Sequence, residues 1–153
     1  MKKYRYLIIL AIIALDQLVK VLVRSNMEPG ESIDVIGKIF SITYIQNRGV
    51  AFSLLSGSGF VLVVLPAIAV VVCVVVMEVL KDMHWSIASF LILTVSGGIG
   101  NIIDRTVLGY VTDMFDFHFW PVFNIADIAI VVGCVMMALY VFKFDKDDEK
   151  PTI

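Results

Sequence analysis

Residues 60–80 read FVLVVLPAIAVVVCVVVMEVL, and this stretch decides the fold class. A helix needs about 20 mostly apolar residues to cross the hydrocarbon core of a bilayer. The only charged residue in the stretch is Glu78, and Pro66 falls in the first turns, where the loss of a backbone donor is tolerated. We therefore expect a membrane-spanning helix over residues 60–80.

Three further apolar segments have the same character, and they lie at residues 4–23, 85–103 and 124–144. The mean hydropathy of +0.93 and the charged fraction of 17% are both outside the range of soluble proteins. A length of 153 residues indicates one domain. The sequence thus predicts a single all-α membrane domain with four transmembrane helices.

The first of these segments begins with a basic stretch, Met1–Arg5, like the start of a secretory signal peptide. However, its apolar run continues past Asp16 to Val23, and no small-x-small cleavage site closes it. We expect it to be retained as the first transmembrane helix.

Lysine and arginine near the ends of the spans predict the orientation. One set flanks the termini and the second connection, and it consists of Lys2, Lys3, Arg5, Lys81, Lys143, Lys146 and Lys150. Fewer cations are spread over the two longer loops, namely Arg24, Lys38, Arg48 and Arg105. Both termini are therefore expected in the cytoplasm, with residues 145–153 as a disordered tail and with loops 24–59 and 104–123 outside.

The first outer loop carries a β signal within residues 26–50. Its segment SIDVIGKIFSITYIQ, residues 32–46, is rich in β-branched and aromatic side chains and has a turn signal at Gly37. We expect a small extracytoplasmic β-element resting on the outer membrane surface. A plain amphipathic loop is the alternative.

Polar residues inside or at the edges of the apolar segments are the candidates for function, because an ionised carboxylate at bilayer depth costs several kcal/mol, roughly 2.5–3.5. They are Asp16, Asn47, Asn101, Asp104, Asp113 and Asp127. The predicted topology places them near the outer interface. Asn101, Asp104 and Arg105 share one helix face by their spacing, and so do Asn124 and Asp127.

Asp113 and Asp127 are separated by a short connection that contains Trp120 and Pro121, so only a chain reversal can bring them together. Two neighbouring carboxylates cannot both ionise easily, and one proton is then shared. Such a pair can activate a water for attack on an amide carbonyl. His84 and His118 are isolated, so neither a zinc site nor a Ser-His-Asp site is indicated, and no metal or cofactor is expected.

Other functions remain open at this point. A small transporter could use the acids to carry protons, although such sites usually lie near the midplane. A non-enzymatic scaffold would tolerate loss of Asp113. The formal net charge of −2 and the scattered cations argue against binding of nucleic acid.

Five motifs in order resemble those of lipoprotein signal peptidase, the signal peptidase II family. They are Asp16-Gln17-x-x-Lys20, Asn47-x-Gly49-x-Ala51-Phe52, Gly97-Gly98-x-Gly100-Asn101-x-x-Asp104-Arg105, Val111-Thr112-Asp113 and Phe123-Asn124-x-Ala126-Asp127. They cover nearly the whole folded chain. Two positions depart from the family pattern, Met114 in place of Phe and Ile128 in place of Ser.

The resemblance implies an aspartic endopeptidase of the bacterial cytoplasmic membrane. It would remove the signal peptide from prolipoproteins by cutting before a diacylglyceryl-modified cysteine, in contact with membrane lipid, and globomycin would be expected to inhibit it. Asp113 and Asp127 would be the catalytic pair. The residues implied to bind substrate or support the site are Asp16, Asn47, Gly49, Asn101, Asp104, Arg105 and Asn124.

Overall fold

The computed structural model describes residues 4–49, 60–80 and 82–148 of the chain. Its long helices are α1 (Arg5–Asn26), α3 (Phe60–Val79), α4 (Trp85–Leu108) and α5 (Ile125–Asp148). By length and composition all four can cross a membrane, α5 over Ile125–Lys143. The four predicted spans are therefore confirmed at this level.

The helix ends differ from the predicted ones in ways that matter for the site. Helix α4 continues to Leu108 instead of ending at residue 103, so Asp104 and Arg105 lie in its last turns. It stops where Gly109 takes a left-handed conformation, with φ of 79°, and donates its N–H to the Arg105 carbonyl. Helix α5 runs to Asp148, so the predicted disordered tail is wrong over residues 145–148, and the rest of it lies outside the described residues.

A three-stranded antiparallel sheet lies beside the helices, in the order β1 (Ser32–Ile36), β2 (Phe40–Asn47) and β3 (Val111–Asp116). The hairpin of β1 and β2 confirms the β-element predicted within residues 26–50, and the alternative of a plain loop is wrong. Residue 50 itself lies outside the described residues. The third strand comes from the second long loop and was not predicted. In the register of β2 and β3, Ile45 is paired with Asp113 and Asn47 with Val111.

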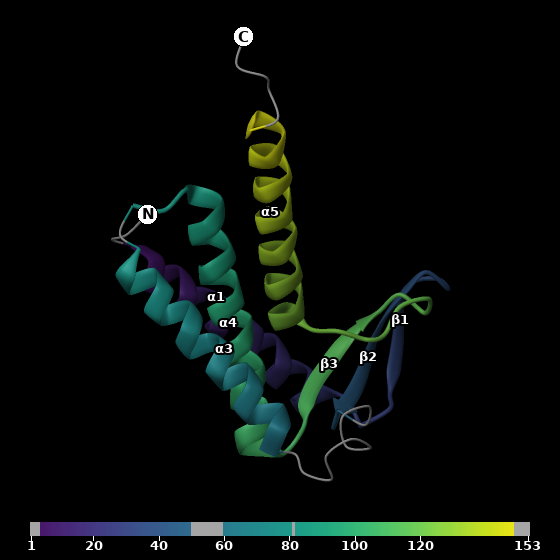
Figure 1. The fold of residues 1–153 in the computed structure, drawn as a ribbon. Coiled ribbons are helices and arrows are strands. Elements are labelled where there is room, and N and C mark those ends of the chain that lie inside the picture. The colour runs from purple at the N-terminus through teal and green to yellow at the C-terminus, as the bar shows by residue number, and fades with distance from the viewer. Residues whose placement is uncertain (1–3, 50–59, 81, 149–153) are drawn as a thin grey trace.

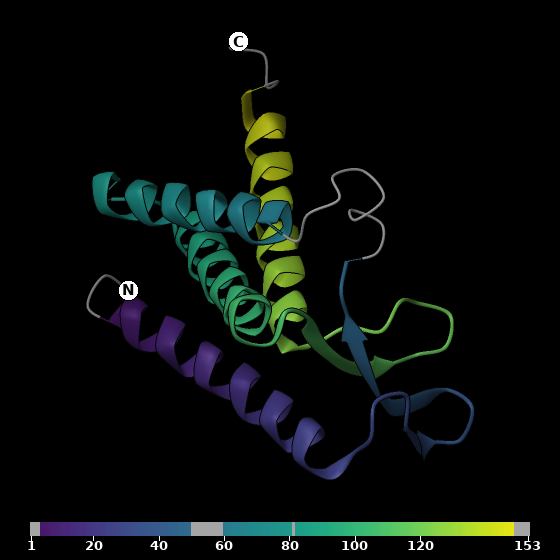
Figure 2. The same ribbon diagram turned by 90° about the horizontal axis from the view of Figure 1, so that it is seen from below.

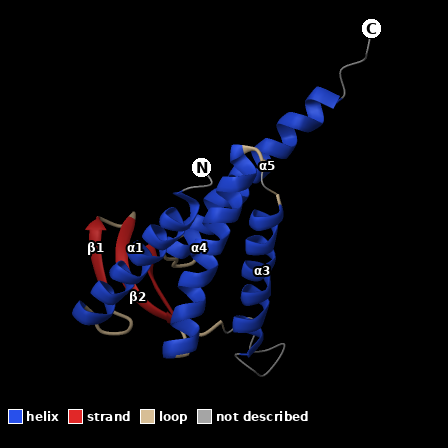
Figure 3. Ribbon diagram, turned by 90° about the vertical axis from the view of Figure 1, so that its left-hand side faces the viewer, coloured by secondary structure: helices blue, strands red, loops and turns tan. Residues whose placement is uncertain are grey.

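Helix α4 is the centre of the bundle and contacts α1, α3 and α5. Figure 2 shows α1 and α3 on either side of it. The sheet lies at the end of the bundle where α1 and α4 end and α5 begins, whereas α1 begins and α5 ends at the opposite end (Figures 1 and 3). The beginning of α1 and the end of α5 therefore lie on one side of the molecule, and which side of the membrane this is stays a prediction.

Glycines of α4 allow the close packing on which the site depends. A Cβ on Gly97 would collide with the backbone carbonyl of Ala126 in α5, and a Cβ on Gly100 would lie 2.6 Å from a carboxylate oxygen of Asp16 in α1. Small residues at such crossings let membrane helices approach closely. These glycines bring α1, α4 and α5 together directly beside Asn124 and Asp127.

Candidate active site

The two aspartates of the predicted pair are brought together by a reversal of the chain between β3 and α5. Asp113 lies in the middle of β3, and Asp127 lies in the first turn of α5. The returning segment is fixed to the strand because the Phe123 carbonyl accepts from the N–H groups of Met114, at 3.0 Å, and Phe115, at 2.8 Å. The reversal that the sequence required is thus present.

Asn124 joins the two carboxylates. It precedes α5 and acts as its cap, because its Oδ1 accepts from the Asp127 N–H at 3.0 Å while its own N–H donates to Asp127 Oδ2 at 3.3 Å. This reciprocal pattern is a capping box, and it fixes the Asp127 side chain against the helix start. The Asn124 Nδ2 group donates to Asp113 Oδ1 at 2.6 Å. One residue therefore contacts both acids and also starts the helix.

Asn47 reaches Asp113 from the end of β2. Its Nδ2 donates to Asp113 Oδ2 at 2.9 Å, and its Oδ1 accepts from the N–H of Gly49 at 2.9 Å. Gly49 has a φ of 67°, a left-handed conformation that favours glycine. The turn at Gly49 thereby directs the amide of Asn47 toward the carboxylate. Ala51 and Phe52 of the same motif lie outside the described residues.

Asn101 reaches the other acid from α4. Its Nδ2 donates to Asp127 Oδ1 at 2.8 Å, and its Oδ1 accepts from Lys20 Nζ at 3.0 Å and Asn124 Nδ2 at 3.2 Å. The side chain is buried. Both aspartates therefore accept hydrogen bonds from asparagines on different elements, and these bonds fix the positions of the two carboxylates.

A buried ionic cluster connects α1 to the rest of the site. Lys20 Nζ lies 2.9 Å from Asp16 Oδ2 and 3.6 Å from Asp104 Oδ2, and all three side chains are at most 1% exposed. Asp16 Oδ1 also accepts from the Ala126 N–H at 2.9 Å, at the start of α5. Buried charges of this kind are stable only when paired and hydrogen-bonded, as they are here.

Asp104 holds the beginning of strand β3. Its Oδ2 accepts from the Thr112 N–H at 2.9 Å, one residue before Asp113. Arg24 lies 3.6 Å from Asp104 Oδ1 and donates to Thr112 Oγ1 at 2.9 Å. Asp104 therefore anchors the start of β3 and pairs with two cations from α1. Its contact with the site is a structural one, through the backbone next to Asp113.

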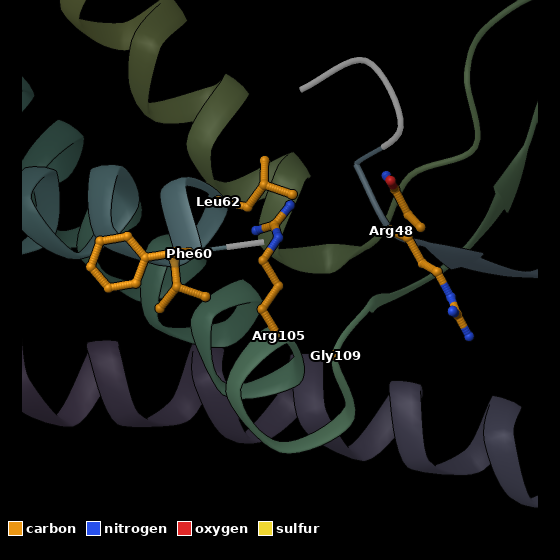
Figure 4. A pocket seen from close by; sticks show the side chains of 7 residues that line it. Arg48, Phe60, Leu62, Arg105 and Gly109 are labelled. Atoms are coloured by element: carbon orange, nitrogen blue, oxygen red, sulfur yellow. The ribbon is translucent and has the colours of Figure 1, made fainter. Parts of the chain in front are cut away.

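Arg105 lines a cavity of about 320 Å³ next to the pair, together with Asn47, Arg48, Phe60, Leu62, Val63 and Gly109. Its side chain extends from the end of α4 toward Leu62 (Figure 4). Its charge interacts with those of Asp127 and Asp113. The cavity combines an apolar wall from α3 with two cations, Arg48 and Arg105, and an amide, a lining suited to a peptide backbone flanked by apolar groups.

The electrostatic setting distinguishes the two acids. Burial raises the pKa of Asp113 from 3.8 to about 6, and the neighbouring charge of Asp127 adds to the rise, although hydrogen bonds from Asn47 and Asn124 oppose it. Asp113 is 1% exposed, whereas Asp127 is only half-buried. Asp113 is therefore the carboxyl that takes up a proton more readily than a free aspartate does.

All the residues predicted for the site lie in or beside this arrangement, but three polar residues of α1 were not included among them. These residues are Lys20, which contacts Asn101, Gln17, which contacts Asp104, and Arg24, which contacts Thr112. Gln17 Nε2 also donates to the Gly100 carbonyl at 3.1 Å. A signal was present in the sequence, because Lys20 lies one helical turn after Asp16 within a membrane span, where an isolated charge is costly.

The two positions that depart from the family pattern lie outside this hydrogen-bonded arrangement. Met114 follows Asp113 in the strand, so its side chain is on the opposite face, where it is buried with Val23 and Tyr44. Ile128 is exposed and lines an apolar groove with four phenylalanines, Phe40, Phe115, Phe117 and Phe123. Met114 and Ile128 therefore pack in apolar surroundings. Within the described residues, no group of three or more His, Cys, Asp or Glu side chains could hold a metal ion.

Four helices able to cross a membrane, with two neighbouring carboxylates at one end of the bundle, define a class, the integral membrane proteins with a polar site between their helices. The sequence pattern of the Signal peptidase (SPase) II family matches residues 8–143. The chain belongs to this family, as the five motifs predicted.

Individual relatives cover nearly the whole chain. A lipoprotein signal peptidase of Halothermothrix orenii is 39% identical over 147 residues, which are 92% of this chain and 97% of that protein. One of Clostridioides difficile is 40% identical over 141 residues, 91% of this chain and 95% of that protein. A bacterial membrane enzyme solved at 2.3 Å has a TM-score of 0.86 and 26% identity, with 99% of this chain and 94% of that chain covered.

Proposed function

We propose that the protein is a membrane-embedded aspartic endopeptidase that removes the signal peptide from bacterial prolipoproteins, cutting before the diacylglyceryl-modified cysteine. The family and the names of its relatives support the substrate class. The observation that carries the mechanism is the Asp113–Asn124–Asp127 arrangement, in which one asparagine hydrogen-bonds both acids. We place this site at the outer face of the cytoplasmic membrane, with both termini in the cytoplasm.

The charge balance of the site supports a pair that holds one proton. The groups that ion pairs or charge interactions connect to the pair are four carboxylates and three cations, namely Asp16, Asp104, Asp113 and Asp127 with Lys20, Arg24 and Arg105. One bound proton makes this group neutral, and neutrality is strongly favoured in a partly dehydrated site. The raised pKa of Asp113 makes it the residue that holds this proton.

In the mechanism that follows, Asp127 is the base and Asp113 the acid. The Asp127 carboxylate takes a proton from a water, whose oxygen attacks the carbonyl carbon of the scissile peptide bond. Asp113 donates its proton to the carbonyl oxygen as the tetrahedral intermediate forms. Collapse of the intermediate breaks the carbon–nitrogen bond, the proton on Asp127 passes to the leaving amine, and the new carboxyl group returns a proton to Asp113.

Asn47 and Arg105 are proposed to hold the substrate backbone, since both line the cavity beside the pair. The acyl chains would remain against the lipid-facing sides of the helices, so the substrate would enter from the membrane. A globomycin-type inhibitor is expected to occupy the same cavity and prevent the approach of the peptide.

Cleavage of a diacylglyceryl-modified prolipoprotein by the purified protein tests the proposal. Wild type should give product, and Asp127→Asn should reduce kcat to background while its melting temperature shows that it is folded. Asp34→Asn is a matched control, because this carboxylate is exposed on β1 and contacts Ser41. Turnover by Asp127→Asn near the wild-type rate would contradict the mechanism, and proton flux in vesicles without cleavage by wild type would favour a transporter.

A further inference from the structure

Three asparagines face the aspartate pair with the NH₂ end of their amides, and each has a donor on its Oδ1. The Gly49 N–H donates to Asn47, the Asp127 N–H donates to Asn124, and Lys20 Nζ donates to Asn101 at 3.0 Å. The two ends of an amide have nearly the same shape, so the hydrogen bonds decide which end points to a carboxylate. These donors therefore set the direction of all three amides.

Lys20 differs from the other two donors because it is a side chain. A lysine ammonium has three donors and no acceptor, so it can only face the oxygen end of the amide. Asn124 Nδ2 also approaches Asn101 Oδ1, but at 3.2 Å, and it is closer to Asp113 Oδ1, at 2.6 Å. The ammonium is thus the main restraint on the Asn101 amide.

The ammonium is itself held in place. Its side chain is fully buried, and it lies 2.9 Å from Asp16 on its own helix and 3.6 Å from Asp104 on α4. The ion pair with Asp16 already balances the charge of Lys20. The additional hydrogen bond to a neutral amide is therefore not required for charge balance, yet it connects α1 to the acid on α5 through a single residue.

We infer that Lys20 is a positioning residue for the reaction, whose ammonium fixes the Asn101 amide so that its Nδ2 donates to Asp127. Without Lys20 the Asn101 Oδ1 keeps only the longer contact from Asn124 Nδ2, at 3.2 Å, so the amide is held less firmly. Its hydrogen bond to Asp127 then weakens, and the acid shifts relative to the attacking water. The inference rests on the proposed function.

A double-mutant cycle with Lys20→Met and Asn101→Ala in the full-length protein tests this role, with kcat and KM measured on the lipidated substrate. Lys20→Met should lower kcat by about tenfold or more and leave KM within about twofold, because small displacements of reacting groups have effects of this size. In the Asn101→Ala background, Lys20→Met should change kcat by less than about twofold, because the amide through which it acts is absent. Lys38→Met, an exposed lysine in the β1–β2 turn, is the matched control and should behave as wild type.

The melting temperature of each variant separates positioning from folding. If Lys20→Met does not fold because Asp16 is left unpaired, Lys20→Gln replaces it in the cycle, since its neutral polar head still contacts Asp16 but ends one atom short. An equal fall of kcat in both backgrounds, or an unchanged kcat in the single variant, overturns the inference alone. Failure of wild type to cleave the substrate overturns the proposed function as well.

Discussion

The stability of the protein should depend on pH through Asp113. Its pKa in the folded protein is about 6, against 3.8 for an ordinary aspartate, because the side chain is buried and faces Asp127. The folded state therefore binds the proton more tightly than the unfolded state does. The contribution of Asp113 to stability is greatest below pH 3.8 and is lost as the pH rises from 3.8 through 6.

The size of this effect follows from the two pKa values. At 1.36 kcal/mol for each pKa unit, the difference between 3.8 and about 6 corresponds to about 3 kcal/mol of stability lost over the full range. Roughly 2 kcal/mol of it falls between pH 4.5 and pH 7.5. For a chain of this length, that amounts to about 4–8 °C in the melting temperature.

The perturbation is Asp113→Asn, which removes the titrating group. The asparagine can keep only one of the two acceptor positions that Asn47 and Asn124 use, so the variant has its own constant cost. That cost does not change with pH. The expected result is therefore a melting temperature that moves in favour of the variant by about 4–8 °C between pH 4.5 and pH 7.5.

The assay is thermal unfolding of the detergent-solubilised protein, followed by the fluorescence of Trp85 and Trp120. Asp34→Asn, the exposed control on β1, should follow wild type at every pH. If the wild-type and Asp113→Asn curves are parallel over this range, the burial argument for Asp113 is wrong, and the assignment of the shared proton to Asp113 is withdrawn.

Three further predictions concern the same site. The value of kcat/KM should fall as the pH rises through about 6, because the proton on Asp113 is required, and a pH series with the lipidated substrate that shows the opposite slope would assign the proton differently. Gly97→Ala should cost about 1–3 kcal/mol of stability and lower kcat, because the new Cβ collides with the Ala126 carbonyl. Thermal unfolding and kinetics check this, with Gly133→Ala as the control. The Cβ of Gly133→Ala has its nearest neighbour, in Leu93, at the longer distance of 3.2 Å, so this variant should be less harmful. Gly49→Ala should cost about 1–2 kcal/mol of stability and reduce kcat, since φ of 67° is strained for alanine and Leu62 lies 2.5 Å from the new Cβ. A wild-type rate in this variant would show that the Asn47 amide does not need this turn.

The helices and the family could be predicted from the sequence because both are recorded in local patterns. Residues 60–80 are apolar nearly throughout, so the span is visible without knowledge of its neighbours. The spacing of Asn101 and Asp104 places them on one helix face, and both side chains are buried in α4. The hairpin was also visible, because both of its strands have β-branched residues and β2 has aromatic ones as well, with a glycine in the turn between them.

Strand β3 could not be found in the same way. It has six residues, two of them aspartates, and aspartate is unfavourable in strands. Its pairing with β2 joins residues more than 60 positions apart, such as Ile45 and Asp113, and only the folded chain brings them together. The sequence therefore placed Asp113 in a connection, although it lies in a strand that holds it firmly.

Lys20 was missed for a related reason. A lysine in the outer part of a membrane helix usually extends its ammonium to the interface. Here the helix packs so that the ammonium is enclosed by Asp16, Asp104 and Asn101, two of which lie on another helix. The i, i+4 spacing of Asp16 and Lys20 favours an ion pair on one helix face, but the contact with Asn101 depends on how α1 crosses α4.

The capping box at the start of α5 has a consequence for biosynthesis. Asp127 and its cap Asn124 stand at the start of the last helix, and Asp113 precedes them in a strand that pairs with a much earlier segment. A growing chain that has not yet delivered α5 to the membrane has Asp113 but lacks its partners Asn124 and Asp127. Under the proposed mechanism such a chain lacks a complete base–acid pair, and proteolytic competence would begin only when insertion of the last helix is finished.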